Sequence, residues 1–229
     1  MNARLTPLVI YGAGGFAREV LQVALDMNAQ TPRWDVRGFL VDPGYDVGEP
    51  VHGLPVMTTD VWTAPADGQL VVGIGDSSAR RAIADRMHAR FGMRFATLVH
   101  PQAWVGRQVR IGEGSVICAG ALITTDISIG RHVHVNLGCT IGHDAVLEDF
   151  VTLNPSVNVS GNVHLCEGVM AGTGAKLIPH IRVGAGTVLG AGAVAVADLP
   201  ADVTAVGMPA KAIRQHDISW SIQSREGQV

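Results

Sequence analysis

A repeat of six residues runs through the second half of the chain. Every sixth position from residue 105 to residue 195 is apolar, without an insertion or a slip. These positions are Val105, Ile111, Ile117, Ile123, Ile129, Val135, Ile141, Leu147, Leu153, Val159, Leu165, Ala171, Leu177, Val183, Leu189 and Ala195. This period fits neither an α-helix nor a long strand. It predicts a β-solenoid in which three hexads close one triangular coil of about 18 residues.

The repeat also predicts which side chains are neighbours. Residues one coil apart should stack in a column, so His143 should lie beside Thr125 and Gly161. The flat outer faces of a solenoid commonly pack against other copies of the chain. We therefore expect a homo-oligomer, most simply a homotrimer.

The first part of the chain has a different pattern. Apolar runs at Leu8–Tyr11, Val36–Leu40 and Val71–Ile74 predict strands, and Phe16–Met27 and Ala79–Phe91 have helical spacing. Strands that alternate with helices predict a small Rossmann-like α/β unit with a parallel sheet. The domain organisation that we expect is 1–97 for the Rossmann-like domain, 98–214 for the solenoid and 215–229 for a C-terminal tail.

Composition narrows the environment and the partners. The net charge is −3 and no segment concentrates Lys or Arg, which argues against nucleic acid as a partner. No stretch reaches the roughly 18 apolar residues of a membrane helix, so no membrane insertion is expected. Cys118, Cys139 and Cys166 form no paired motif and are expected to be free thiols in a reducing compartment. We therefore expect a cytoplasmic protein.

A glycine-rich turn follows the first predicted strand and opens the first helix. Gly12, Gly14 and Gly15 provide the close backbone approach and the helix N-terminus that a diphosphate requires. Taken alone, this turn fits a nicotinamide dinucleotide, or only a tight strand–helix connection. The candidate ligand-binding residues at this sheet edge are Gly12, Gly14, Gly15, Phe16, Asp42, Gly73 and Asp76.

His143 and Asp144 are the residues that the solenoid repeat does not need. A neutral imidazole is a suitable general base near pH 7, and a neighbouring carboxylate fixes its tautomer. The alternative is a solvated corner histidine. His132, His134, His164 and His180 also lie on the solenoid, but they form no evident ligand trio, so no metal is expected.

Five segments carry a narrower resemblance. "VIYGAGGFAREV", "GFLVD", "VVGIGDSSARR", "HVNLGCTIGHDAVLEDF" and "AVGMPAKAIR" follow one another in this order. In these segments the chain resembles the hexapeptide-repeat sugar O- and N-acyltransferases of the sialic acid O-acetyltransferase type, which include enzymes acting on nucleotide-linked amino sugars. The resemblance implies a left-handed β-helix, acetyl-CoA as co-substrate, a nucleotide-linked sugar held by the N-terminal domain, and a trimer with active sites between subunits.

The resemblance also implies roles for individual residues. His143 falls on the family's catalytic histidine, Asp144 on the acidic residue beside it, and Asn136 on an asparagine near the same site. Coenzyme A would lie toward the C-terminal coils, where small residues leave backbone N–H groups open; otherwise these glycines serve only the solenoid corners. The candidates for this side are Gly161, Thr173, Ala191 and Lys211, of which Lys211 would meet a phosphate or belong to a terminal cap.

The chain departs from the family at three positions. Asp144 stands where some members have Glu, Thr152 where a second histidine is common, and Phe16 where some relatives have His. The reaction we expect is N-acetylation of an amino group on a nucleotide-linked deoxy-sugar. The alternatives are O-acetylation of a sugar hydroxyl, a nicotinamide-dependent enzyme, and a non-catalytic nucleotide-binding scaffold.

Overall fold

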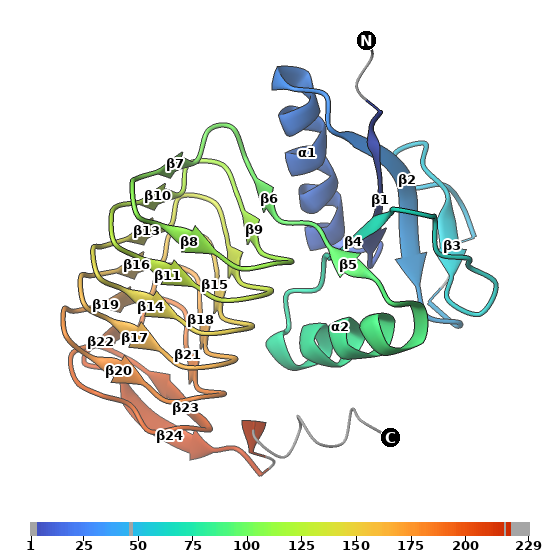
Figure 1. Cartoon of the computed structure of the whole chain (residues 1–229). Coiled ribbons are helices and arrows are strands. Elements are labelled where there is room, and N and C mark those ends of the chain that lie inside the picture. Colours follow the sequence, from blue (N-terminus) through green and yellow to red (C-terminus); the bar gives the residue numbers. More distant parts are fainter. Residues whose placement is uncertain (1–3, 46–47, 218, 221–229) are drawn as a thin grey trace.

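The computed structural model describes residues 4–45, 48–217 and 219–220, and it consists of an α/β unit beside a β-solenoid (Figure 1). The α/β sheet has the order β3-β2-β1-β4-β5, and all of its strands run parallel. Its elements are β1 (Thr6–Tyr11), α1 (Gly15–Gln30), β2 (Trp34–Val41), β3 (Val56–Thr58), β4 (Gln69–Val72), α2 (Ser77–Phe91) and β5 (Arg94–Phe95).

The two helices cover opposite faces of this sheet. Leu8, Ile10 and Val71 pack with α1, whereas Val9 and Val72 belong to the core on the side of α2. This alternation is the period-two pattern of a strand that is buried on both faces. The strand order reverses between β1 and β4, and in open parallel sheets ligands bind at such a point, beyond the carboxyl ends of the strands.

The two helices and the three strands expected in this unit are present, but β3 and the two-residue β5 were not predicted. Val56–Thr58 is only three residues long and half-buried, so it has no apolar run to identify it. It extends the sheet next to β2 at the edge away from β4.

The solenoid consists of three sheets that follow the hexad repeat, and their strand pairs are parallel except for the antiparallel pair β23–β24. One sheet contains β7, β10, β13, β16, β19 and β22, and the second contains β8, β11, β14, β17 and β20. The third contains β6, β9, β12, β15, β18, β21, β23 and β24. The strands are β6 (Leu98–Val99), β7 (Trp104–Val105), β8 (Arg110–Ile111), β9 (Val116–Ile117), β10 (Leu122–Ile123), β11 (Ser128–Ile129), β12 (His134–Val135), β13 (Thr140–Ile141), β14 (Val146–Leu147), β15 (Thr152–Leu153), β16 (Asn158–Val159), β17 (His164–Leu165), β18 (Met170–Ala171), β19 (Lys176–Leu177), β20 (Arg182–Val183), β21 (Val188–Leu189), β22 (Val194–Ala195), β23 (Val203–Val206) and β24 (Lys211–Gln215).

The predicted register is confirmed residue by residue. Each of the sixteen apolar positions is the second residue of a strand, from Val105 in β7 to Ala195 in β22. Leu122 pairs with Thr140 and Thr140 with Asn158, so successive coils are 18 residues apart. The interior is a continuous core of these side chains, in which only the first two positions, Val105 and Ile111, are partly buried.

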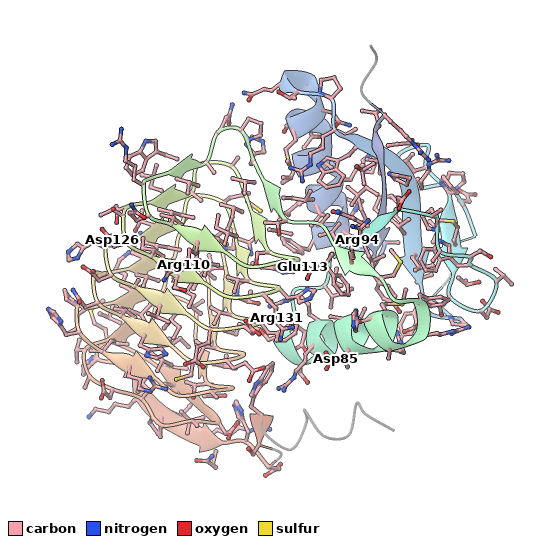
Figure 2. The ribbon with its side chains drawn as sticks, in the orientation of Figure 1. Asp85, Arg94, Arg110, Glu113, Asp126 and Arg131 are labelled. Atoms are coloured by element: carbon pink, nitrogen blue, oxygen red, sulfur yellow. The ribbon has the colours of Figure 1, made fainter. Side chains whose placement is uncertain are left out.

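The third sheet of the solenoid faces the α/β unit. Leu98, Val116 and Cys118 join the core beneath α1, while Phe150 and Trp220 join the core on the side of α2. Glu113 extends from the solenoid toward β5 (Figure 2), where its Oε1 accepts the Phe95 amide hydrogen at 2.6 Å.

Other expectations concern thiols, membrane helices and the tail. Cys118, Cys139 and Cys166 are all buried and free, as expected. In the described ranges, no helix has the length and apolarity needed to cross a bilayer. Most of the expected tail lies outside the described residues, but Trp220 is 5% exposed, and the bulk of its ring is accommodated because Gly168 and Gly186 have no Cβ there.

Candidate functional site

His143 and Asp144 occupy one corner of a solenoid coil, directly after β13. The Nδ1–H of His143 donates to Asp144 Oδ2 at 2.7 Å, and both side chains are more than half exposed. Asp144 adopts a left-handed backbone conformation with φ of 58°. In the neutral imidazole with its proton on Nδ1, Nε2 carries a lone pair, and no hydrogen bond occupies it within the described part of the chain. The pair has the arrangement of a general base with an orienting carboxylate.

Gly161 lies one coil beyond His143, against the imidazole. A Cβ built on Gly161 would be 2.7 Å from His143 Nε2, closer than real Cβ atoms approach their neighbours. The Asn162 amide donates to the His143 carbonyl at 2.8 Å, and the Asp144 amide donates to the Thr125 carbonyl at 3.3 Å. The predicted column is confirmed. The φ of Gly161 is not in the left-handed region, so the backbone conformation does not require glycine there. Glycine is needed because the His143 ring covers the position where a Cβ would lie.

Asn136 and two of the candidate coenzyme-side residues, Thr173 and Ala191, lie on a different corner from His143 and Gly161. Asn136 is buried and follows β12, so one flat side of the prism, formed by β13, separates it from His143. Thr173 and Ala191 are exposed residues of that same corner in later coils, and the Thr173 carbonyl accepts the Gly192 amide at 2.8 Å. Lys211 is exposed at the start of β24. One chain therefore does not bring these residues to His143.

The glycine-rich turn borders a cavity of about 540 Å³ at the carboxyl ends of β1, β2 and β4. Gly12 and Gly14 line this cavity, and Gly15 begins α1 beside it. Gly12 has φ of 100°, and a Cβ there would lie 2.8 Å from Ile74 Cδ1. The backbone conformation therefore favours glycine at this position, and a Cβ would in addition displace the end of the Ile74 side chain. The N-terminus of α1 offers free amide hydrogens for an anionic group.

Asp42 also lines the cavity, and its carboxylate is held by neighbours that the sequence did not reveal. Arg86 Nη2 donates to both carboxylate oxygens at 2.8 Å and to the Tyr11 hydroxyl at 2.6 Å, and Thr59 Oγ1 donates to Asp42 at 3.3 Å. Burial raises the pKa of Asp42, but hydrogen bonds from Tyr11 and Arg86 and the charge of Arg86 outweigh it, so the pKa lies below its ordinary value. Asp42 is therefore ionised at neutral pH.

Gly73 and Asp76 have structural tasks at the same sheet edge. A Cβ on Gly73 would be 2.8 Å from Ala17 Cα, so this glycine lets α1 approach the end of β4. Asp76 is the N-cap of α2, and its Oδ1 accepts the Ala79 amide hydrogen at 2.8 Å. Neither residue lines the cavity.

Phe16 and Thr152, the two positions where family histidines are replaced, lie on either side of His134. The Phe16 ring packs on the His134 ring with centroids 4.8 Å apart, and Thr152 pairs with His134 in the sheet. Thr152 is 1% exposed, and its hydroxyl donates to the Gly75 carbonyl at 3.1 Å. Both side chains thus belong to the contact between the α/β unit and the solenoid.

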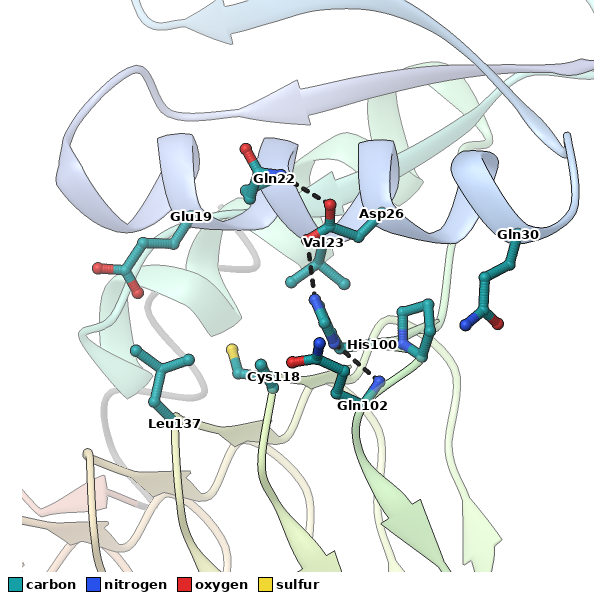
Figure 3. A pocket seen from close by; sticks show the side chains of 11 residues that line it. Glu19, Gln22, Val23, Asp26, Gln30, His100, Gln102, Cys118 and Leu137 are labelled. Atoms are coloured by element: carbon teal, nitrogen blue, oxygen red, sulfur yellow. Dashed lines mark hydrogen bonds and ion pairs between the residues drawn. The ribbon is translucent and has the colours of Figure 1, made fainter.

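A second cavity of about 500 Å³ lies between α1 and the first coils (Figure 3). Glu19, Asp26 and Leu137 are among the residues that line it. Asp26 accepts a hydrogen bond from His100 at 2.8 Å, and this bond lowers the pKa of Asp26 despite a weaker opposing effect of burial. This cavity could not be predicted from the sequence, because its walls come from a helix and from coils that are far apart in the chain.

One cluster outside these sites has the donor types of a metal site. The ligand atoms of Glu148, His164 and Cys166 all lie within 4.8 Å of one another. His164 Nε2 is 2.5 Å from Glu148 Oε1, while its Nδ1 is 2.6 Å from Arg182 Nη1. Both ring nitrogens therefore have protein partners, and the positive charge of the Arg182 guanidinium beside His164 would repel a metal cation.

Comparison with known proteins relates this arrangement to characterised enzymes. A family model described as the PglD N-terminal domain matches residues 7–87. The GDP-perosamine N-acetyltransferase of Escherichia coli O157:H7 is 29% identical over 92% of this chain and 97% of that protein. A serine acetyltransferase of Buchnera aphidicola is 33% identical over 61% of this chain and 46% of that protein.

Solved structures extend the similarity to almost the whole fold. A histidine variant of perosamine N-acetyltransferase from Caulobacter crescentus, in complex with CoA and GDP-perosamine, has a TM-score of 0.81 and 30% identity over 93% of this chain and 99% of that chain. The acetyltransferase domain of PglB from Neisseria gonorrhoeae FA1090 has a TM-score of 0.80 and 33% identity over 90% and 99%.

These similarities agree with the sequence and the geometry. The expected fold, a Rossmann-like α/β region followed by a left-handed parallel β-helix, is confirmed. The expected enzyme class, an acyltransferase, is confirmed as well. With the hexad repeat, the glycine-rich turn and the full-length similarity together, the chain belongs to the hexapeptide-repeat sugar acyltransferase family.

Proposed function

We propose that this chain transfers an acetyl group from acetyl-CoA to the amino group of a nucleotide-linked deoxy-amino-sugar, with His143 as the general base. The observation that carries this proposal is the exposed His143–Asp144 pair with an open Nε2 on a fold that is similar, over nearly its full length, to an enzyme bound to CoA and GDP-perosamine. Further support comes from the cavity beside the glycine-rich turn, which has the features of a diphosphate site.

His143 would take the proton of the sugar amine as the nitrogen attacks the thioester carbonyl. Asp144 would keep Nδ1 protonated and stabilise the imidazolium that forms. The C–N bond forms, the C–S bond breaks, and the proton on Nε2 can pass to the departing thiolate. The Gly161 amide makes no hydrogen bond in the described chain and is a candidate donor to the developing oxyanion.

The two-corner arrangement favours a homotrimer with active sites between subunits. His143 and Gly161 lie on one corner of the prism, whereas Asn136, Thr173 and Ala191 lie on another. A site that uses both sets must be assembled from two copies of the chain. Exposed apolar side chains on the intervening face and its edge, including Trp104, Leu122 and Leu137, support such packing.

The substrates would then approach from different directions. The nucleotide-sugar would bind at Gly12, Gly14, Gly15 and Asp42, whose ionised carboxylate can accept hydrogen bonds from a ribose or a base. Acetyl-CoA would lie along the later coils, with Lys211 available to a phosphate group. A cytoplasmic location is part of the same proposal, since the three buried free thiols suit a reducing compartment.

A rate measurement tests the proposal. The purified protein is incubated with acetyl-CoA and GDP-perosamine, and release of the CoA thiol is followed over time. His143→Ala should lose most of kcat with the oligomer and the fold intact, while His52→Ala, at an exposed histidine of the α/β unit, should not. Turnover near the parent value in His143→Ala would exclude the role of this residue as the base.

O-acetylation is the second candidate reaction. A serine acetyltransferase is similar to 61% of this chain, its named substrate carries a hydroxyl as well as an amino group, and a hydroxyl needs the same base. A sugar whose amino group is replaced by hydroxyl, offered in the same assay, separates the two reactions. Equal turnover of the hydroxyl analogue would favour O-acetylation.

A further inference from the structure

Arg80 of α2 is an arginine with no exposed surface, located between the α/β unit and the solenoid. Almost all of its acceptors are backbone carbonyls. They are the carbonyls of His132 (2.9 Å), Ile74 (2.9 Å), Gly75 (3.0 Å), Phe150 (2.7 Å) and Val151 (3.4 Å), together with Thr152 Oγ1 (2.8 Å). No carboxylate is among its hydrogen-bond partners in residues 4–45, 48–217 and 219–220.

This placement of a charge has a cost that apolar packing would avoid. Burial lowers the pKa of Arg80 to about 9, partly offset by the charge of Asp76, so the guanidinium remains charged at neutral pH. Apolar replacements of buried ionic groups are often neutral or stabilising, so a buried charge is weak evidence for stability alone. What the planar guanidinium provides is direction, since its N–H groups point along fixed lines.

The acceptors on the two sides are not arbitrary. Ile74 and Gly75 follow β4, and Ile74 lines the cavity beside Gly12. On the solenoid side, the chain from His132 to Phe150 makes one complete coil. That coil carries Asn136, His143 and Asp144. Arg80 therefore binds both ends of the candidate catalytic coil and the turn of the nucleotide cavity with one side chain.

Two hydroxyls complete this connection. Thr152 Oγ1 accepts a hydrogen bond from Arg80 and donates one to the Gly75 carbonyl. Ser77 Oγ lies 3.1 Å from Thr152 Oγ1. Both hydroxyls are buried. A histidine at position 152 would occupy the space in which these bonds form.

We propose that Arg80 is a positioning residue, which fixes the turn at Ile74–Gly75 against the coil that carries His143. This inference rests on the proposed function, because the turn matters for the reaction only if the cavity beside it holds the nucleotide-sugar. Arg80 makes no contact with the cavity lumen and acts through the Ile74 and Gly75 carbonyls.

The test compares Arg80→Lys, Thr152→Val and the control Arg90→Lys at the exposed end of α2. Lysine keeps the charge but cannot reach all of the carbonyls at once. For Arg80→Lys we expect kcat/KM for GDP-perosamine to fall roughly tenfold to a hundredfold, because small misplacements cost rates of this order. KM for acetyl-CoA should stay within about twofold, since that substrate is expected along the later coils. Thr152→Val should give a smaller loss of the same kind, and Arg90→Lys none.

Two readouts do not depend on turnover. Hydrogen exchange at residues 73–80 and 148–154 should increase together in both Arg80→Lys and Thr152→Val, and GDP should bind more weakly while CoA binds as before. Unchanged GDP affinity and unchanged kcat/KM in a folded Arg80→Lys would overturn the inference. Equal weakening of GDP binding and CoA binding would also overturn it, because that result would indicate a general structural effect. If Arg80→Lys does not fold, Thr152→Val decides by the same criteria. An inactive parent protein would instead refute the proposed function.

Discussion

The contact between Gly161 and His143 predicts a separation of stability from activity. In Gly161→Ala the new Cβ would lie 2.7 Å from Nε2 and 2.8 Å from Cε1, whereas ordinary contact begins at 3.4 Å. The ring must therefore move by about 0.7 Å. The side chain of His143 is 62% exposed and can yield into solvent, so the strain is released by displacing the base.

The expected magnitudes follow from this displacement. A shift approaching 1 Å at a reacting group can cost about a hundredfold in rate, so kcat should fall roughly 30- to 100-fold. The free energy of unfolding should change by less than about 1 kcal/mol, because Gly→Ala at an allowed φ restricts the unfolded chain and offsets the local strain. Initial rates of CoA release and urea unfolding measure the two quantities.

A double variant identifies the path of the effect. In the His143→Ala background the ring is gone, so adding Gly161→Ala should change the residual rate by less than about twofold. Ser160→Ala, the neighbouring corner position, serves as the control and should leave both quantities unchanged. A Gly161→Ala enzyme with kcat within threefold of the parent would refute the reasoning, as would a further large loss in the double variant.

Three further predictions concern the remainder of the structure. Burial, reinforced by the charge of Arg80, lowers the pKa of His132 to about 3 and that of His134 well below 6.5. The free energy of unfolding should therefore be highest above pH 6.5, where both histidines are neutral in either state. It should decrease as the pH falls toward 3, by roughly 3 kcal/mol at pH 5.5. Urea midpoints at pH 7.5 and 5.5 measure it, and His132→Leu should halve the difference. Trp220→Ala should lower the free energy of unfolding by about 3–5 kcal/mol in urea titrations, whereas Val61→Ala, at a 77% exposed site, should cost under about 1 kcal/mol. Gly12→Ala should weaken GDP binding in calorimetry about tenfold or more and leave CoA binding unchanged, because Cβ would meet Ile74 at a φ of 100°; equal weakening of both ligands would contradict this.

The solenoid could be predicted from the sequence because its core is one-dimensional. Each interior position depends on its place in the hexad, so sixteen residues from Val105 to Ala195 identify sixteen strands, and the column of Thr125, His143 and Gly161 follows by counting. The short β3 escaped prediction because Val56–Thr58 is stabilised by pairing with β2 and not by a pattern of its own.

The candidate site could be predicted only where a local sequence pattern marks it. His143 stands out because a hexad does not require it, and the glycine-rich turn because strand and helix flank it. Arg80 has no such signal, since its partners are mainly carbonyls that any sequence would provide. The same holds for Arg86, whose partner Asp42 becomes a neighbour only when α2 folds over the strand ends.

The replacement of two family histidines by Phe16 and Thr152 acquires a physical meaning from this geometry. Both residues contact His134, whose ring nitrogens have no hydrogen-bond partner in the described chain and whose pKa burial holds far below the ordinary value. A histidine at position 152 would remove the hydroxyl that accepts from Arg80 Nη2 and donates to the Gly75 carbonyl. With threonine there, the guanidinium binds both the nucleotide turn and the coil of His143. At position 152 the departure from the family pattern and the buried arginine are thus parts of one arrangement, and Thr152→His should increase hydrogen exchange at residues 73–80 and 148–154.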